Sequence, residues 1–197
     1  MRNFKIMIQI KKLDKDKIPQ IAKIHKQCLS NGFIASFPLG FLEKYYDTLF
    51  ESKDVFTYIA VDDQKVLGFI TATYNVKALP KILITHLWKE VIILIKNPLF
   101  LVKIFQLSLH PSLRDEKSSC EIPSIAVVPS ARRHGLGKKL ISAAKLEFKG
   151  KGFKKFQLSL RDSMQEANTF YQRLGLKKVK SAKFLGETIN FWQGGLF

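Results

Sequence analysis

The stretch Ile125-Ala126-Val127-Val128-Pro129-Ser130-Ala131-Arg132-Arg133-His134-Gly135-Leu136-Gly137 decides the fold of this chain. Its apolar beginning predicts a buried strand over about 122–128, which Pro129 ends. An apolar stripe at helical spacing follows the two glycines and predicts a helix over about 137–148, ended by Gly150. A strand, a basic glycine loop and a helix therefore follow one another.

The loop between this strand and this helix has the chemistry of an anion site. Glycine lets the backbone turn tightly and approach a ligand, and the amides and dipole at a helix start favour an anion. Arg132, Arg133 and His134 add positive charge. The loop predicts a phosphate or pyrophosphate cradle, with a basic turn that binds nothing as the alternative. It matches neither a Walker loop nor the three-glycine dinucleotide fingerprint.

The segments after the loop predict parallel pairing. We expect a strand over 156–160, a helix over 165–174, and strands beginning at 177 and over 187–192. Two strands joined through a helix in this way pair in parallel around the crossover helix.

The segments before the loop predict antiparallel strands. We expect a strand over 4–10, helices over 18–29 and 39–50, and a hairpin of strands 55–61 and 66–74. Asp14 and Asp16 precede the first helix as candidate caps. The fold class is α/β (α+β), with a mixed, mostly antiparallel central sheet flanked by helices.

The segment 79–110 predicts an inserted helical hairpin, divided at Asn97-Pro98. Lysines interrupt it too often for the ~20 apolar residues of a membrane span. Two interpretations stay open: a lid or dimer face, and an apolar groove for a hydrophobic acceptor or for peripheral membrane contact.

Composition fits a single domain, 1–197, with an ordinary soluble balance. The formal charge of +17 is dispersed along the chain and is typical of a solvated surface, although it also suits a polyanionic partner. No aromatic platform accompanies it, so we expect no nucleic-acid binding. Cys28 and Cys120 suggest neither a disulfide framework nor a metal site, and they favour a reducing, cytoplasmic location without a metal.

The region 120–180 resembles the GNAT superfamily of acyl-CoA-dependent N-acetyltransferases. Arg132, Gly135 and Gly137 match the family's Arg/Gln-x-x-Gly-x-Gly/Ala signature. Downstream, the family's Ala…Phe-Tyr…Leu-Gly segment is matched by Ala167, Phe170, Tyr171, Leu174 and Gly175. The upstream segments resemble a subgroup with a helical insertion between strands three and four.

The resemblance implies an enzyme that transfers an acetyl group from acetyl-CoA to a primary amine of a small molecule, in a ternary complex. The subgroup favours an amino sugar as the acceptor. Strand backbone would pair with the pantetheine arm and the loop would bind the pyrophosphate. The implied cofactor-binding residues are Ile125, Val127, Arg132, Arg133, His134, Gly135, Leu136, Gly137 and Lys138.

Two catalytic residues are implied by the resemblance. Tyr171 would protonate the departing thiolate, because a phenol with an ordinary pKa of ~10 keeps its proton at neutral pH. Glu121 would take the proton of the amine, directly or through a water. An aromatic packing role for Tyr171 and a surface role for Glu121 are the alternatives.

One position departs from the family pattern. The family often has a cofactor-contacting asparagine where this chain has Met164, and Asn168 lies too close to Tyr171 to be assigned that role. This departure weakens cofactor binding without excluding catalysis. A non-catalytic acyl-CoA-binding regulatory module is therefore the second hypothesis, and a homodimer stays open.

Overall fold

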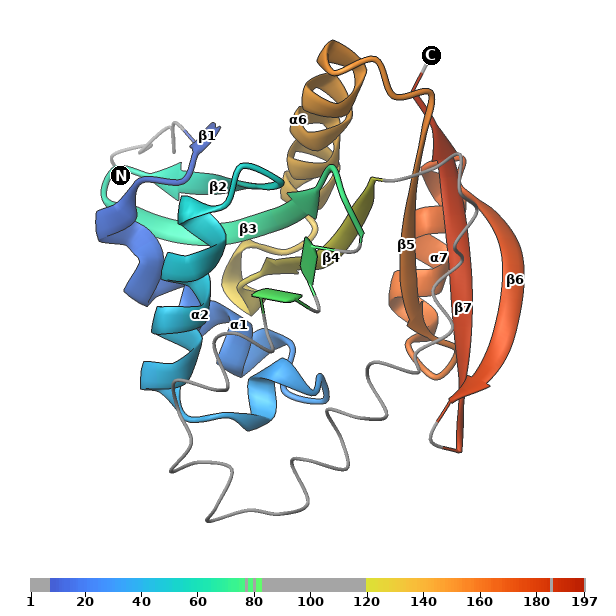
Figure 1. Ribbon diagram of the computed structural model, residues 1–197, viewed down its shortest axis with the longest axis horizontal. Helices are drawn as coiled ribbons and strands as arrows, with labels where there is room; N and C mark the ends of the chain where they lie inside the picture. Colours follow the sequence, from blue (N-terminus) through green and yellow to red (C-terminus); the bar gives the residue numbers. More distant parts are fainter. Residues whose placement is uncertain (1–7, 77, 80, 83–119, 185, 197) are drawn as a thin grey trace, which may run out of the picture. The chain divides into compact units, whose positions relative to one another are not determined.

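One mixed sheet runs through the computed structural model, which describes residues 8–76, 78–79, 81–82, 120–184 and 186–196. Among these residues seven strands follow the order β1-β2-β3-β4-β5-β7-β6 (Figure 1). The strands are β1 (Gln9–Lys12), β2 (Val55–Asp62), β3 (Lys65–Thr73), β4 (Glu121–Val127), β5 (Lys155–Arg161), β6 (Lys177–Phe184) and β7 (Glu187–Gly195). The helices are α1 (Ile18–Cys28), α2 (Leu39–Glu51), α6 (Leu136–Gly150) and α7 (Gln165–Arg173).

The pairing of the strands confirms the mixed, mostly antiparallel sheet. β4 and β5 are parallel, with Glu121 opposite Gln157. β1 pairs antiparallel with β2, and β7 pairs antiparallel with both β5 and β6. The helix α6 lies between β4 and β5 in the chain, as expected for a parallel crossover.

The chain divides into two compact units. The first contains Met1–Ala72 and Ser124–Ala144, and the second contains Thr73–Pro123 and Lys145–Phe197.

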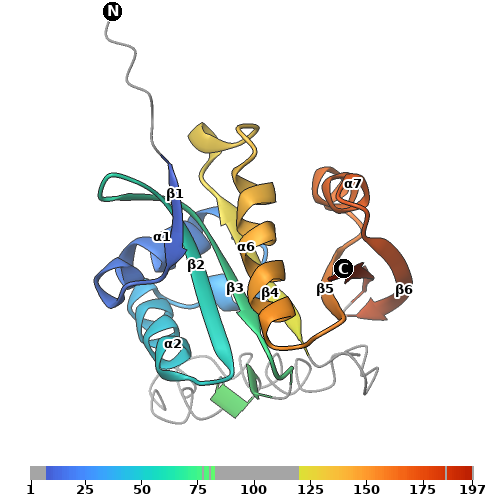
Figure 2. The ribbon, with the colours of Figure 1, turned by 90° about the horizontal axis from the view of Figure 1, so that it is seen from above.

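In the first unit, helices cover both faces of the strands. α1 and α2 lie side by side against one face of β1–β3, and the beginning of α6 lies on the other face (Figure 2). The helices fit there because each buries an apolar stripe. In α6 the stripe within this unit is made of Leu136, Leu140, Ile141 and Ala144.

A buried polar pair joins α1 to α2 in the core of the first unit. Nδ1 of His25 and the hydroxyl of Tyr46 lie 2.5 Å apart, and both rings contact Phe69 of β3. Burial lowers the pKa of His25 to about 4, so its imidazole is neutral near pH 7. The hydrogen bond offsets the cost of placing two polar groups in an apolar core.

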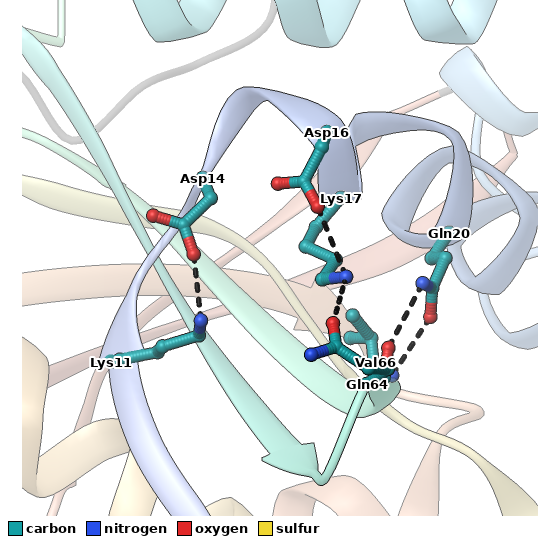
Figure 3. A network of polar contacts seen from close by, with 7 residues as sticks. All are labelled: Lys11, Asp14, Asp16, Lys17, Gln20, Gln64 and Val66. Carbon is teal, nitrogen blue, oxygen red and sulfur yellow. Dashed lines mark hydrogen bonds and ion pairs between the residues drawn. The ribbon is translucent and has the colours of Figure 1, made fainter.

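Polar side chains fasten the β2–β3 turn to the start of α1 (Figure 3). Nζ of Lys17 donates to Oε1 of Gln64 at 2.7 Å, and Gln20 bonds the backbone of both Gln64 and Val66. Neither aspartate forms the expected side-chain cap: Asp14 accepts from Lys11, and Asp16 pairs with Lys17 (Figure 3). A short 3-10 turn over Lys15–Lys17 precedes α1, so Asp14 is at the N-cap of that turn and Lys17 is at the N-cap of α1.

In the second unit, α7 packs on the strands β5, β7 and β6 (Figures 1 and 2). Phe148 of α6 stacks on Phe156 of β5. The backbone of β7 approaches this stack so closely that a Cβ at Gly194 would lie 2.4 Å from the Phe156 ring. Glycine at this position therefore lets β7 pass over an aromatic core residue.

The remaining sequence predictions have mixed outcomes. The helices and the hairpin agree with α1, α2, α6, α7 and β2–β3 to within a few residues. β1 overlaps only the end of the strand predicted over 4–10, and residues 1–7 lie outside the described residues. Of the predicted insertion 79–110, only residues 79, 81 and 82 are described, and they are helical. Its hairpin lies outside the described residues. No described helix is long and apolar enough to cross a membrane.

Candidate active site

The basic loop turns sharply between β4 and α6. A 3-10 turn over Pro129–Ala131 follows β4, and α6 begins at Leu136. Arg133 and Gly135 have positive φ angles of 63° and 75°. A Cβ on Gly135 would meet nothing within 4 Å, so glycine serves the backbone conformation there and leaves the space beside it open.

The first amides of α6 are available to an anion. Lys139 is the first residue whose N–H donates back into the loop, to the carbonyl of Gly135 at 3.0 Å. The amides of Leu136, Gly137 and Lys138 have no backbone partner among the described residues, as is usual in a first helical turn. Arg132, Arg133, His134 and Lys138 are exposed around them. These groups fit a pyrophosphate in number, charge and access.

The backbone of β4 presents alternate residues to β3. The N–H of Val128 donates to the carbonyl of Leu67 at 2.9 Å, and the carbonyl of Ala126 would lie 2.7 Å from a Cβ on Gly68. Because successive residues of a strand point their backbone groups to opposite sides, Ile125 and Val127 direct theirs away from β3. This is the orientation that the predicted pantetheine contacts require.

Arg132 bonds back to β4. Its Nε donates to the carbonyl of Val127 at 3.0 Å, and its own carbonyl lies 2.7 Å from Nδ1 of His134. The Val127 carbonyl therefore already has a donor, which sequence reasoning did not anticipate. Arg132 as a residue is exposed.

Glu121 begins β4 in the second unit and has the electrostatics of a base. Burial raises its pKa to about 7, and a hydrogen bond from the side chain of Gln157 opposes the shift. A carboxyl with a pKa near neutrality can both accept a proton and release it. The residue as a whole is half-buried.

Tyr171 is the buried residue of α7, also in the second unit. It is 6% exposed, and its ring contacts that of Phe170. Burial raises the pKa of its hydroxyl above the ordinary value of 10.0, so the phenol keeps its proton at neutral pH. The structure shows no hydrogen bond from this hydroxyl to another described residue.

Asn168 has a structural role that its sequence position did not reveal. Its Nδ2 lies near the carbonyls of Arg161, Asp162 and Met164, at 2.9, 3.3 and 3.0 Å. Its Oδ1 accepts from Asn190 and from Trp192, both at 3.1 Å. Asn168 therefore fixes the turn from β5 into α7, while Met164 is 43% exposed at the start of that helix.

A polar cavity of about 650 Å³ opens beside this network. Its walls come from α7, β6 and β7 and from the turn before α7. The lining residues are Asp162, Gln165, Asn168, Thr169, Gln172, Leu176, Lys177, Lys178, Asn190 and Trp192. None of the predicted site residues lines it.

The structure groups the predicted site residues in two sets. The predicted cofactor residues lie together in the first unit, on the end of β4 and the start of α6. Glu121 and Tyr171 belong to the second unit. No group of three or more His, Cys, Asp or Glu side chains suited to a metal ion occurs in the described parts of the chain.

Comparison with protein families gives one match. The sequence model of the acetyltransferase (GNAT) family matches residues 26–176, which include the loop, β4, β5 and α7. No curated protein sequence matches the chain.

Solved structures of the same fold are numerous. An N-acetyltransferase from Staphylococcus aureus Mu50 has a TM-score of 0.64 at 15% identity, over 96% of this chain and 99% of that one. The ribosomal-protein-S18-alanine N-acetyltransferase of Escherichia coli has a TM-score of 0.61 at 16% identity, over 96% and 94%. Arabidopsis thaliana NAA60, solved with acetyl-CoA, has a TM-score of 0.59 at 14% identity, over 96% and 98%. These similarities establish the fold.

Proposed function

The chain belongs to the GNAT acetyltransferase family, and from this membership we propose that it transfers an acetyl group from acetyl-CoA to a primary amine of a small molecule. We favour an amino sugar as the acceptor, on the basis of the subgroup resemblance in the sequence. We also propose that it acts in the cytoplasm.

The observation that carries the proposal is the loop at the start of α6. Its positive φ angles, its amides without a backbone partner among the described residues and its exposed cations support a role as a receptor for a diphosphate. A coenzyme A thioester has such a diphosphate and supplies the acetyl group when bound. The loop would hold it through Leu136–Lys138 amides and through the cations of Arg132 and Lys138.

Glu121 would act as the base. An amine is mostly protonated at neutral pH, and it must lose a proton before or during attack on a thioester. A carboxyl with a pKa of about 7 is ionised in about half of the molecules at that pH and accepts the proton far more readily than an ordinary glutamate. A water can relay this proton to Glu121.

Tyr171 would act as the acid. The departing sulfur needs a proton, and the phenol retains one because burial raises its pKa. Its hydroxyl has no hydrogen bond to another described residue that would compete with the sulfur.

An amine panel tests the proposal. Purified protein is incubated with acetyl-CoA and with amino sugars, small diamines and peptides, while free thiol release and product mass are followed. We expect thiol release that depends on the amine, a product heavier by one acetyl group, and loss of turnover in Glu121→Gln.

Two other results are informative. Binding of acetyl-CoA without turnover by any amine, unaltered by Tyr171→Phe, would indicate the regulatory module instead. Acetylation of peptides alone would keep the reaction but reject the small-molecule acceptor.

A further inference from the structure

The side chain of Gln157 carries a buried acceptor without a donor. The residue is 3% exposed, and its Oε1 atom has no hydrogen-bond partner among the described residues. It is the one buried side-chain nitrogen or oxygen in that condition within the described part of the chain. Such a group costs free energy in the folded state, so its retention at this position calls for a ligand.

Gln157 lies beside the proposed base. It is opposite Glu121 in the parallel β4–β5 pair, and paired residues of neighbouring strands point their side chains to the same face. Its neighbour Phe156 points to the other face, where it stacks on Phe148 of α6. Gln157 and Glu121 therefore share the face of β5 that is turned away from α6.

The two polar ends of Gln157 have different tasks. Its side chain stabilises the charged form of Glu121, and a carboxylate only accepts hydrogen bonds, so the amide nitrogen is the end that serves Glu121. The oxygen is then left to accept from a donor. A bound amine brings such a donor to the base.

We propose that Gln157 is a positioning residue that accepts a hydrogen bond from the N–H of the acceptor amine while its amide orients Glu121. This inference rests on the proposed function and names a residue that selects the primary amine. A neutral primary amine has two N–H groups and a lone pair. One N–H bonds to Oε1 of Gln157, the other faces Glu121, and the lone pair attacks the thioester carbon.

The reaction then balances without a further reactant. The new C–N bond forms as the C–S bond breaks, the amine proton passes to Glu121, and the sulfur takes a proton from Tyr171. A secondary amine has a single N–H and can satisfy Gln157 or Glu121 but not both. We therefore expect selectivity for a primary amine over its N-methyl analogue.

Gln157→Met tests this inference. The substitution keeps the side-chain length and removes both polar ends. We expect kcat/KM for a primary amine that the wild type acetylates to fall about 10- to 100-fold. The preference over the N-methyl analogue should shrink by a similar factor, while KM for acetyl-CoA stays constant. The melting temperature should stay constant or rise, because an unsatisfied buried acceptor is removed.

Gln193→Met is the matched control. Gln193 lies opposite Gln157 on β7 and is half-buried, so the same chemical change is made one strand away. The control should keep the wild-type preference for the primary amine. Gln157→Leu provides a second side-chain shape should the methionine variant fail to fold.

The possible outcomes distinguish a failure of the role of Gln157 from a failure of the proposed function. Unchanged selectivity in both Gln157 variants, or a lower melting temperature with unchanged kinetics, would overturn the role of Gln157 and assign its oxygen to the fold. A wild-type protein that acetylates no amine would overturn the proposed function itself, and the inference with it.

Discussion

Nε of Arg132 donates to the carbonyl of Val127 at 3.0 Å, so the first cation of the loop is tied to the strand that precedes it. The bond closes a short ring of backbone between β4 and α6. It holds the loop in the conformation that exposes the first amides of the helix. An arginine can do this and still offer its terminal nitrogens to a phosphate, because the guanidinium carries several donors on one rigid plane.

Arg132→Lys separates the charge from this bond. Lysine keeps the positive charge but has no Nε–H donor, so the loop loses its tie to Val127. We expect the dissociation constant for coenzyme A, measured by calorimetry, to increase about tenfold. Lys139→Ala, an exposed cation one turn into the helix, should change it less than twofold. Equal affinity in Arg132→Lys and in the wild type would show that charge alone matters.

Gly135→Ala tests the backbone conformation of the loop. The φ angle of 75° is unfavourable for an L residue, so we expect a loss of about 1–2 kcal/mol in unfolding free energy, and weaker coenzyme A binding. Gly150→Ala, at the far end of the helix that follows this loop, is the matched control, because a Cβ there also meets nothing within 4 Å and φ is ordinary. It should stabilise the protein by about 0.4–1 kcal/mol. Urea denaturation measures the unfolding free energy of both variants. An equal change in the two variants would show that the backbone at Gly135 is not strained by a side chain.

Activity should follow the ionisation of Glu121. The carboxylate is the active form and its pKa is about 7, so kcat/KM should rise with pH below that value and level off above it. Glu121→Gln should remove this limb of the profile and lower kcat by about 10²- to 10⁴-fold. An unchanged limb in the variant would assign the ionisation to another group.

The stability of the folded protein should also depend on the ionisation of Glu121, but in the opposite direction: stability should fall as pH rises, whereas activity should rise. The folded-state pKa of about 7 exceeds the ordinary 4.5, so the folded state binds more protons between these values and loses stability as pH rises through them. Glu121→Gln should therefore gain in melting temperature relative to the wild type between pH 5 and pH 8. Calorimetric scans of both proteins at pH 5 and pH 8 measure whether the melting temperature of Glu121→Gln rises relative to that of the wild type.

Two tyrosines provide a contrast between chemistry and packing. Tyr171→Phe should lower kcat about 10²-fold or more with little change in melting temperature, because its hydroxyl bonds to no other described residue. The hydroxyl of Tyr74 donates to Glu147 at 2.7 Å. Tyr74→Phe should therefore cost about 1 kcal/mol of stability and leave kcat unchanged. Full activity in Tyr171→Phe would remove Tyr171 from the mechanism.

Asn168→Ala should destabilise the second unit. The substitution leaves the indole of Trp192 without its acceptor, leaves the amide nitrogen of Asn190 with Asp162 as its acceptor among the described residues, and frees the turn before α7. We expect a loss of about 2–4 kcal/mol in unfolding free energy. The exposed neighbour provides the control, and Thr169→Ala should cost less than about 0.5 kcal/mol. A loss in Asn168→Ala as small as that of the control would contradict the network.

The sequence predicted the parts of this fold that local patterns encode. Apolar periodicity located α1, α2 and α7, and the glycines located the turn before α6. For β1 only the end of the predicted strand can be compared, because residues 1–7 lie outside the described residues; Gln9–Lys12 pairs antiparallel with β2, and this partner depends on tertiary pairing that a short alternating pattern does not encode.

Only the part of the candidate site that contains a sequence motif could be predicted from the sequence. The signature at Arg132–Gly137 indicated the loop, but nothing in the spacing showed that Arg132 bonds to Val127. Gln157 gave no signal at all, since polar residues that alternate with apolar ones in a strand usually face solvent. Its importance comes from the register that places it opposite Glu121 and from the burial of its oxygen. Both are properties of the folded sheet.

The outer strand β6 has a further consequence for the behaviour of the protein in solution. Among the described residues it ends the strand order, and its lysines at 177, 178, 180 and 183 are exposed, so a strand added beside it would meet positive charge. A second molecule that tried to add its own β6 there would bring two cationic rows together, and the repulsion opposes such strand addition. The lysines thus guard against fibrous aggregation, and high salt, which screens them, should weaken that protection.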